Sequence, residues 1–145
     1  MTHVNLGKIH PDAYQHVKAL STDADAALVR AGLDPKVGEL VKIRVSQLNG
    51  CAFCLRMHVR DAIERGETND RLAVVAAWWE SQYFTEQEQA ALALAEQITR
   101  IAEPARHEWD NGSLDDQQVS AISWVAIVIN TWNRIAIQSH YPVAP

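Results

Sequence analysis

Apolar side chains recur every three or four residues along most of the chain, which is the period of an amphipathic α-helix. The first such segment spans residues 11–30 and ends before Gly32. Asp34 and Pro35 then provide an N-cap acid and a proline at the first helical position, and the next apolar stripe continues to Gly50. These signals predict two consecutive helices in the first third of the chain.

Two further helices are predicted around the middle of the chain. The first opens at Cys51 and ends at Gly66, because glycine commonly follows the last turn of a helix. The second is capped by Thr68 or Asn69, whose side chains can accept hydrogen bonds from the N–H groups of a first turn. The apolar residues of this segment are Leu72, Val75, Ala76 and Trp79.

Two capping patterns mark the last two helices. Thr85 with Glu88, and Ser113 with Asp116, have the three-residue spacing of a capping box. The first pattern precedes an apolar stripe of Ala91, Leu94, Ala95, Ile98 and Ile101. The second precedes the longest apolar segment, residues 119–137. The chain is therefore expected to contain about six helices.

Length and composition agree with this helical pattern. The chain has 145 residues and a mass of 16.2 kDa, which is the size of one ordinary domain. Its hydrophobic share of 48% and charged share of 21% are close to globular averages. Six Gly and five Pro, mostly at the predicted breaks, argue against a turn-rich sandwich or barrel. We expect residues 1–145 to form a single all-α domain, a helical bundle.

The charge balance excludes two classes of partner. A net charge of -5 and a pI near 5.6 leave no basic field to attract nucleic acid or anionic lipid. Residues 1–5 lack the basic and apolar regions of a secretory signal, and no apolar run approaches the roughly 18 residues of a membrane span. We expect a cytoplasmic protein with neither nucleic acid nor membrane as a partner.

One segment raises the question of self-association. Residues 122–129 are apolar almost all round the predicted helix, which is typical of a helix enclosed by its own fold or by a partner subunit. The chain also has five tryptophans, at positions 78, 79, 109, 124 and 132. Because buried indole N–H groups need hydrogen-bond partners, these residues are either core fillers or subunit contacts. The sequence leaves both interpretations open.

Candidate chemistry is concentrated in residues 51–58. Cys51 and Cys54 stand three apart at a predicted helix start, where they can form a disulfide. The unpaired N–H groups of the first turn stabilise a thiolate there, and this effect alone favours Cys51. His58 follows Cys54 by four residues, so its imidazole lies on the same helix face, within reach of that sulfur directly or through one water.

A histidine base is most useful when a carboxylate orients it, and two candidates exist. Asp61 is three residues beyond His58 on the same predicted helix. Glu39 is on the preceding helix; at about 1.5 Å per residue, Glu39 and His58 lie roughly 13 and 10 Å from the break between the helices. If the two helices form a hairpin, these side chains meet at similar heights. From the residues alone, the two carboxylates are equally good candidates.

Residues 38–58, from Gly38-Glu39 through Cys51-Ala52-Phe53-Cys54 to His58, closely resemble the core motif of the AhpD-like alkylhydroperoxidases of the carboxymuconolactone decarboxylase superfamily. The family pattern is a Glu twelve residues before a Cys-x-x-Cys pair, with a His after three more residues. Every member of that pattern is present here. The resemblance implies an AhpD-like helical fold that assembles into trimers or hexamers.

The resemblance further implies a thiol-dependent peroxidase with antioxidant function. Cys54 would be the peroxidatic thiol that attacks a hydroperoxide, and Cys51 would resolve the product to a disulfide. Glu39 and His58 would form the proton relay, so the resemblance favours Glu39 over Asp61. It implies no cofactor and no metal, and its reductant is a thiol protein, which in the characterised family type bears a lipoyl group.

The sequence departs from the family pattern at one position. The characterised type has a second His immediately before the peroxidatic Cys, and Phe53 stands there in this chain. The expected proton relay therefore lacks the second His. This difference is expected to affect the rate of turnover and the identity of the reductant.

Other interpretations of the same residues remain. The two Cys can be small buried residues without a role, and Glu39 can pair with Lys42 or Lys36 on its own helix. Cys51, Cys54 and His58 could ligate zinc, but they supply only three of the four ligands that a closed structural zinc site needs. A c-type haem is excluded because Leu55 follows Cys54. A lactone decarboxylase-like enzyme, a redox-sensing oligomer and a metal-binding module are the alternative functions.

The remaining cationic side chains are interpreted as solvated faces or subunit contacts, and the remaining histidines, which show no pairing pattern, as surface residues. The cationic members are Lys42, Arg44, Arg56, Arg60 and Arg65, and the histidines are His10, His16, His107 and His140.

Overall fold

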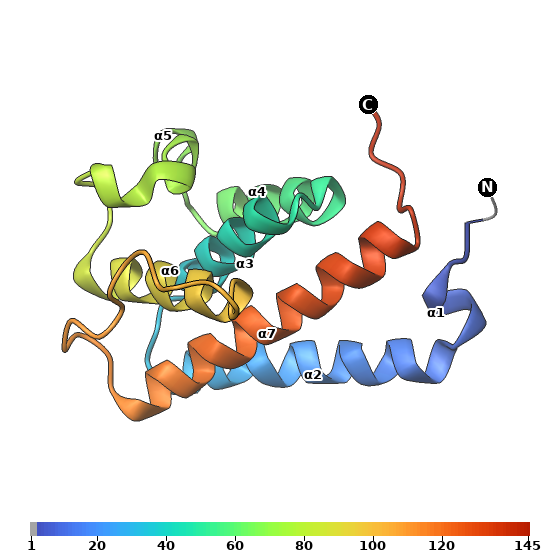
Figure 1. Ribbon diagram of the computed structural model, residues 1–145, viewed down its shortest axis with the longest axis horizontal. Helices are drawn as coiled ribbons and strands as arrows, with labels where there is room; N and C mark the ends of the chain where they lie inside the picture. The colour runs from blue at the N-terminus through green and yellow to red at the C-terminus, as the bar shows by residue number, and fades with distance from the viewer. Residues whose placement is uncertain (1–2) are drawn as a thin grey trace.

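Helices make up all the regular secondary structure of residues 3–145, the range that the computed structural model describes (Figure 1). Their bounds, in chain order, are α1 Leu6–Ile9, α2 Pro11–Arg30, α3 Pro35–Asn49, α4 Ala52–Glu64, α5 Asn69–Ala73, the 3₁₀ helix η1 Val75–Glu80, α6 Glu86–Thr99 and α7 Asp116–Gln138. The expected all-α fold is confirmed. Residues 1–2, part of the segment considered above for a secretory signal, lie outside the described range.

Helix α3 is the centre of the bundle. It packs against α4, α6 and α7, while α7 crosses the molecule beside α2 (Figure 1). Nine of the α3 residues are buried, among them the polar side chains of Glu39, Arg44 and Ser46. A helix enclosed on most sides can hold such groups only if each one has a partner, so α3 sets where buried polar chemistry occurs.

The turn between α3 and α4 follows the sequence prediction. The Asp34 carboxylate caps the start of α3 by accepting from the Lys36 N–H at 2.9 Å. Gly50 ends the helix with φ 68°, a left-handed conformation that glycine adopts without strain. The chain then turns back, and Cys51 becomes the N-cap of α4. Helices α3 and α4 therefore lie side by side as the expected hairpin.

The helix predicted after Thr68 is broken in two. Thr68 caps the short α5, and non-helical φ and ψ angles at Ala77 kink the following η1. Because side chains three residues apart align along a 3₁₀ helix, Val75 and Trp78 both point inward. Trp79 is 47% exposed, whereas its neighbour Trp78 is buried, so of the two only Trp78 is a core filler in the single chain.

The capping boxes give a mixed result. The box of Thr85 with Glu88 is present at the start of α6. The box predicted for Ser113 with Asp116 is wrong, because Asp115 is the N-cap of α7. The Ser113 hydroxyl instead lies 2.5 Å from the Asn111 side-chain oxygen, within the preceding loop. Helix α7 therefore starts later in the chain than predicted, because Ser113 takes part in a local turn with Asn111.

Two further differences lie near the ends of helices. Helix α1, capped by Asn5, was not predicted, because four residues are too few to display a helical period. Its Leu6 N–H donates to Ser139 Oγ at 3.1 Å, which joins the N-terminal segment to the end of α7. Ile101 lies beyond α6 and is 87% exposed, so it does not continue the inward stripe.

No helix among residues 3–145 combines the length and the apolar character of a bilayer span.

Candidate active site

Both cysteines lie at the buried start of α4 and are free thiols. Cys51 is the N-cap, and its Sγ accepts a hydrogen bond from the Cys54 N–H at 3.4 Å. Each residue is only 2% exposed. The first turn of α4 therefore directs one of its unpaired N–H groups at a sulfur, as expected for a dithiol placed at a helix N-terminus.

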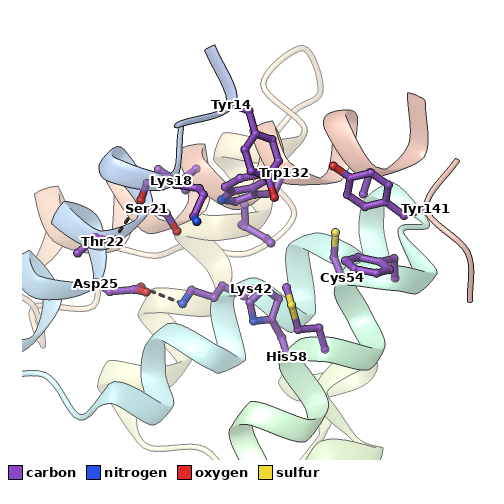
Figure 2. A pocket seen from close by; sticks show the side chains of 15 residues that line it. Tyr14, Lys18, Ser21, Thr22, Asp25, Lys42, Cys54, His58, Trp132 and Tyr141 are labelled. Carbon is purple, nitrogen blue, oxygen red and sulfur yellow. Dashed lines mark hydrogen bonds and ion pairs between the residues drawn. The ribbon is translucent and has the colours of Figure 1, made fainter. Parts of the chain in front are cut away.

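Cys54 and His58 face a cavity of about 400 Å³ that α2, α4 and α7 enclose (Figure 2). Its apolar wall includes Phe53, Met57, Ile129, Trp132 and Tyr141. Cys51 is not among the lining residues. Cys51 is the residue nearer the helix N-terminus, but the cavity opens onto Cys54, so a small molecule entering it meets Cys54 first.

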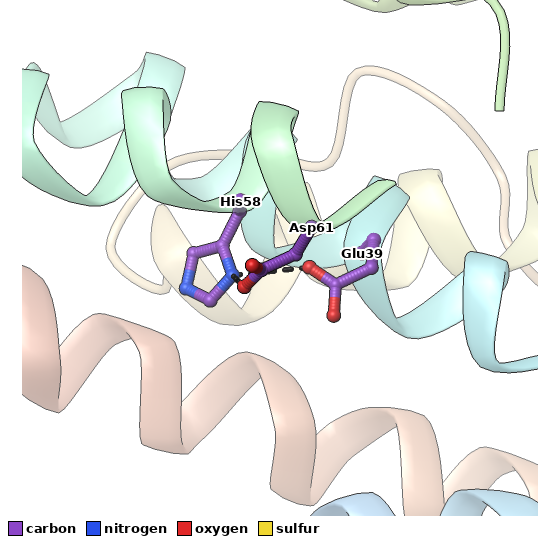
Figure 3. A group of neighbouring side chains, drawn as sticks. All are labelled: Glu39, His58 and Asp61. Carbon is purple, nitrogen blue, oxygen red and sulfur yellow. Dashed lines mark hydrogen bonds and ion pairs between the residues drawn. The ribbon is translucent and has the colours of Figure 1, made fainter. Parts of the chain in front are cut away.

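The structure brings His58 and Glu39 together across the α3–α4 hairpin. His58 Nδ1 lies 3.0 Å from Glu39 Oε2 (Figure 3). Asp61 Oδ2 also lies near the same nitrogen, at 3.5 Å. Both carboxylates that the sequence left open contact the imidazole. They differ in environment: the Glu39 side chain is 4% exposed, against 43% for Asp61.

Glu39 is held ionised by its surroundings. Burial raises the pKa of its carboxyl, but the His58 hydrogen bond and the charges of Lys42 and Arg65 outweigh burial and leave the pKa below its ordinary value. Lys42 Nζ and Arg65 Nε each lie 3.5 Å from Glu39 Oε1. Lys42 is also paired with Asp25 at 2.8 Å, so its expected place on a solvated face was wrong.

These contacts also bear on metal binding. The ligand atoms of Glu39, His58 and Asp61 all lie within 4.8 Å of one another. This set differs from the Cys51, Cys54 and His58 set considered for zinc. Lys42 and Arg65 already neutralise the free oxygen of Glu39, and their charges would oppose a divalent cation. The donor set therefore suits a proton relay better than a metal.

The Cys54 thiol is protonated at neutral pH. Burial first, and then its hydrogen bond with Cys51, raise the pKa of Cys54 to about 12, while a hydrogen bond from Asn133 acts in the opposite direction. A thiol whose pKa is raised in this way is almost entirely protonated at pH 7. Chemistry at Cys54 therefore needs a nearby base, and His58 lines the same cavity.

Sequence reasoning missed Asn133. This residue of α7 is fully buried. Its Nδ2 donates to Ser46 Oγ at 3.1 Å, and its Oδ1 accepts from Asn49 Nδ2 at 2.9 Å. A side-chain amide has two N–H donors, so the second remains for the Cys54 sulfur. A polar residue just after the most apolar stretch of the chain was the available signal.

Phe53 occupies the position where the family pattern has a second His. Its ring lines the Cys54 cavity and meets the Tyr141 ring edge to face, with centroids 5.0 Å apart. Phe53 adds apolar surface to the cavity that holds the thiol, and its side chain supplies no group that can transfer a proton.

The sequence relationships agree with this geometry. The sequence model of the carboxymuconolactone decarboxylase family matches residues 11–97, a range that includes Glu39, both cysteines and His58. The chain belongs to the carboxymuconolactone decarboxylase family. Within that family it is an AhpD-like member, as the solved structure described next supports.

Two curated relatives and one solved structure extend the comparison. The uncharacterized protein YdfG of Bacillus subtilis is 38% identical over 121 residues, which cover 79% of this chain and 81% of YdfG. The uncharacterized protein YnjA of Escherichia coli is 39% identical over 67 residues, covering 46% of this chain and 37% of YnjA. ATU0492 of Agrobacterium tumefaciens, a protein of unknown function described as a candidate antioxidant defence protein AhpD, superposes with a TM-score of 0.84. That similarity has 33% identity and covers 99% of this chain and 100% of the solved one.

Proposed function

We propose that this protein is a thiol-dependent peroxidase that reduces organic hydroperoxides. The observation that carries the proposal is the arrangement of Cys54 and His58 on one cavity wall, with Glu39 3.0 Å behind the imidazole. A nucleophile, a base and a group that orients the base are the three parts of an activated thiol. The apolar wall of the cavity suits the organic part of a hydroperoxide.

The first step oxidises Cys54. His58 accepts the thiol proton at Nε2, and Glu39 stabilises the resulting imidazolium through Nδ1–H. The thiolate attacks the terminal oxygen of the hydroperoxide, an S–O bond forms and the O–O bond breaks. The departing alkoxide takes the proton back from His58. The products are an alcohol and a sulfenic acid on Cys54, so the sulfur loses two electrons and the peroxide gains them.

The second step forms the disulfide. The Cys51 sulfur, already beside Cys54 at the start of α4, attacks the sulfenic sulfur. An S–S bond forms, the S–O bond breaks, and the hydroxyl leaves as water with the Cys51 proton. Two thiols and one hydroperoxide thus give one disulfide, one alcohol and one water. We propose that a lipoyl-bearing protein is the thiol reductant, and that it returns the disulfide to the dithiol in the cytoplasm.

Two serine variants test this function. Cys54→Ser removes the attacking sulfur and should abolish hydroperoxide consumption. Cys51→Ser keeps the attacking sulfur but not the resolving one, so it should consume one equivalent of hydroperoxide and then stop. Retained turnover in Cys54→Ser would contradict the proposal.

The name of the family offers a second candidate, a lactone decarboxylase-like enzyme in which the thiols have no role. The same pair of variants separates the two functions. A decarboxylase that uses only Glu39 and His58 would keep its activity in Cys54→Ser, whereas the peroxidase would lose it. A redox sensor would form the disulfide without repeated turnover.

We also propose that the protein is a homo-oligomer, a trimer or hexamer. Trp124 and Ile127 lie among the buried residues of helix α7, yet they are 47% and 41% exposed in the single chain. A second copy would cover this apolar surface. Light scattering on the intact protein measures the assembled mass, and a monomer at working concentration would contradict the proposal.

A further inference from the structure

A second cavity, of about 220 Å³, lies among α3, η1 and the C-terminal end of α6. The residues that line it are Arg44, Trp79, Glu96, Arg100, Arg106 and His107, none of which lines the Cys54 cavity. The mechanism proposed above uses none of them. Three arginines and a histidine around one small space are unusual in a chain with a net charge of -5.

The deepest part of this cavity is a buried ion pair. Arg44, which is 8% exposed, donates from Nε to Glu96 Oε1 at 2.7 Å. The same oxygen accepts from Trp78 Nε1 at 3.0 Å. Arg44 Nη1 donates to Gln47 Oε1 at 3.2 Å, which leaves Nη2 without a partner among residues 3–145. The expectation that Arg44 is solvated was wrong, because α6 supplies a buried carboxylate.

The outer part of the cavity carries uncompensated positive charge. No carboxylate oxygen among the described residues lies within 4.0 Å of the guanidinium of Arg100 or Arg106. The charges of Arg44 and Glu96 offset each other. Arg100 and Arg106 therefore give the cavity lining a formal charge of +2. Glu103 does not line this cavity, but it lines a narrow adjoining cleft that shares Arg100 and Arg106 with it.

One wall of the cavity is held by aromatic contacts. The His107 ring stacks on Trp79 with centroids 4.7 Å apart, and the Arg44 guanidinium lies over the same indole at 5.9 Å. His107 Nε2 is also 4.0 Å from Glu96 Oε2, so its expected place as an unpaired surface residue was wrong. These contacts keep His107 and Arg44 in fixed positions, as a binding site requires.

We propose that this cavity binds a small oxyanion, either a phosphate group or a carboxylate. Guanidinium groups present paired N–H donors that match the oxygens of both groups. At the buried floor, Arg44 Nη2 is free to donate to a bound anion. At the rim, the guanidinium groups of Arg100 and Arg106 can donate as well. Arg44 is on the same helix as Glu39, so an anion bound here would contact the helix that holds the relay carboxylate. The proposal does not depend on the peroxidase function.

Thermal unfolding of the full-length protein tests the site. Sodium phosphate and sodium succinate are each titrated against sodium chloride of equal ionic strength. Saturable binding at about ten times Kd should raise Tm by about 5 °C for a chain of this size. A rise with phosphate alone identifies a phosphate site, a rise with succinate alone identifies a carboxylate site, and a rise with both identifies a general oxyanion site.

Arginine variants distinguish binding from a general salt effect, because phosphate also stabilises proteins by exclusion from their surface. Arg100→Gln and Arg106→Gln change the rim without disturbing the buried Arg44–Glu96 pair, and each should lose at least half of the rise. Arg60→Gln, an exposed arginine on α4, is the matched control and should keep it. An equal rise in all four proteins, or no rise in the wild type, would overturn the proposal.

Discussion

His58 Nδ1 lies 3.0 Å from Glu39 Oε2, although the two residues are nineteen positions apart in the chain. Because Glu39 is ionised, the Nδ1 proton is donated to it, and Nε2 is left as the base. The α3–α4 hairpin therefore determines the tautomer of the imidazole as well as its position. In the proposed mechanism this imidazole is the base for the Cys54 thiol, whose pKa burial raises.

Glu39 and Asp61 should contribute unequally to catalysis. Glu39→Gln removes the buried charge that stabilises the imidazolium, and we expect kcat/KM for a hydroperoxide to fall by about 100-fold, within the usual range for acid–base groups. Asp61→Asn removes a charge that water already screens, so a fall of less than about threefold is expected. Steady-state rates of both variants provide the measurement. A larger loss in Asp61→Asn would reverse our assignment of the relay.

Asn133 should control how readily Cys54 ionises. Its hydrogen bond lowers a thiol pKa that burial raises, so Asn133→Leu should raise that pKa further. Below this pKa, alkylation of Cys54 by iodoacetamide should rise about tenfold per pH unit, because the thiolate is the reactive form. In a Cys51→Ser background, Asn133→Leu should shift this profile to higher pH. Asn130→Leu is the control; an equal shift there would indicate a packing effect instead.

Phe53 should limit turnover. Phe53→His restores the second imidazole of the family pattern, and we expect it to raise kcat by adding a proton donor beside the cavity. Phe53→Leu is the control, because it also loses the edge-to-face contact with Tyr141 but adds no imidazole. Steady-state kinetics with one hydroperoxide compare the three proteins. Equal rates in both variants would show that the missing histidine has no kinetic consequence.

Lys18 should favour hydroperoxides that carry a carboxylate. It lines the cavity opposite the thiol and has no carboxylate oxygen within 4.0 Å among residues 3–145 (Figure 2). Lys18→Met should raise KM for a fatty-acid hydroperoxide by roughly tenfold, the size of one charged hydrogen bond. KM for the methyl ester should not change. Lys36→Met, a charge loss outside the cavity, is the control, and an equal effect on acid and ester would refute the role of Lys18.

Local patterns predicted local structure well. Pro35 and Gly50 fixed the ends of α3, and Thr85 fixed the start of α6, because capping depends on residues within one turn. The sequence could also anticipate the approach of Glu39 to His58. If the chain turns back after Gly50, the two helices form a hairpin that brings these side chains to similar heights. Spacing along the chain could not choose between Glu39 and Asp61, because burial separates them.

Tertiary contacts explain what the sequence could not predict. Arg44 and Glu96 are fifty-two residues apart, and each looks like a surface charge until α3 and α6 pack together. Asn133 becomes significant only when α7 crosses α3 and meets Ser46 and the thiol. The kink at Ala77 likewise has no local signature, since its segment contains neither Gly nor Pro.

A stoichiometric titration tests the central claim most directly. One equivalent of an organic hydroperoxide is added to the reduced protein, and free thiols, remaining peroxide and intact mass are followed over time. The mechanism predicts that both thiols disappear together with the peroxide and that the mass falls by two hydrogens, with Cys51 and Cys54 joined. Thiols and peroxide that persist side by side would contradict it.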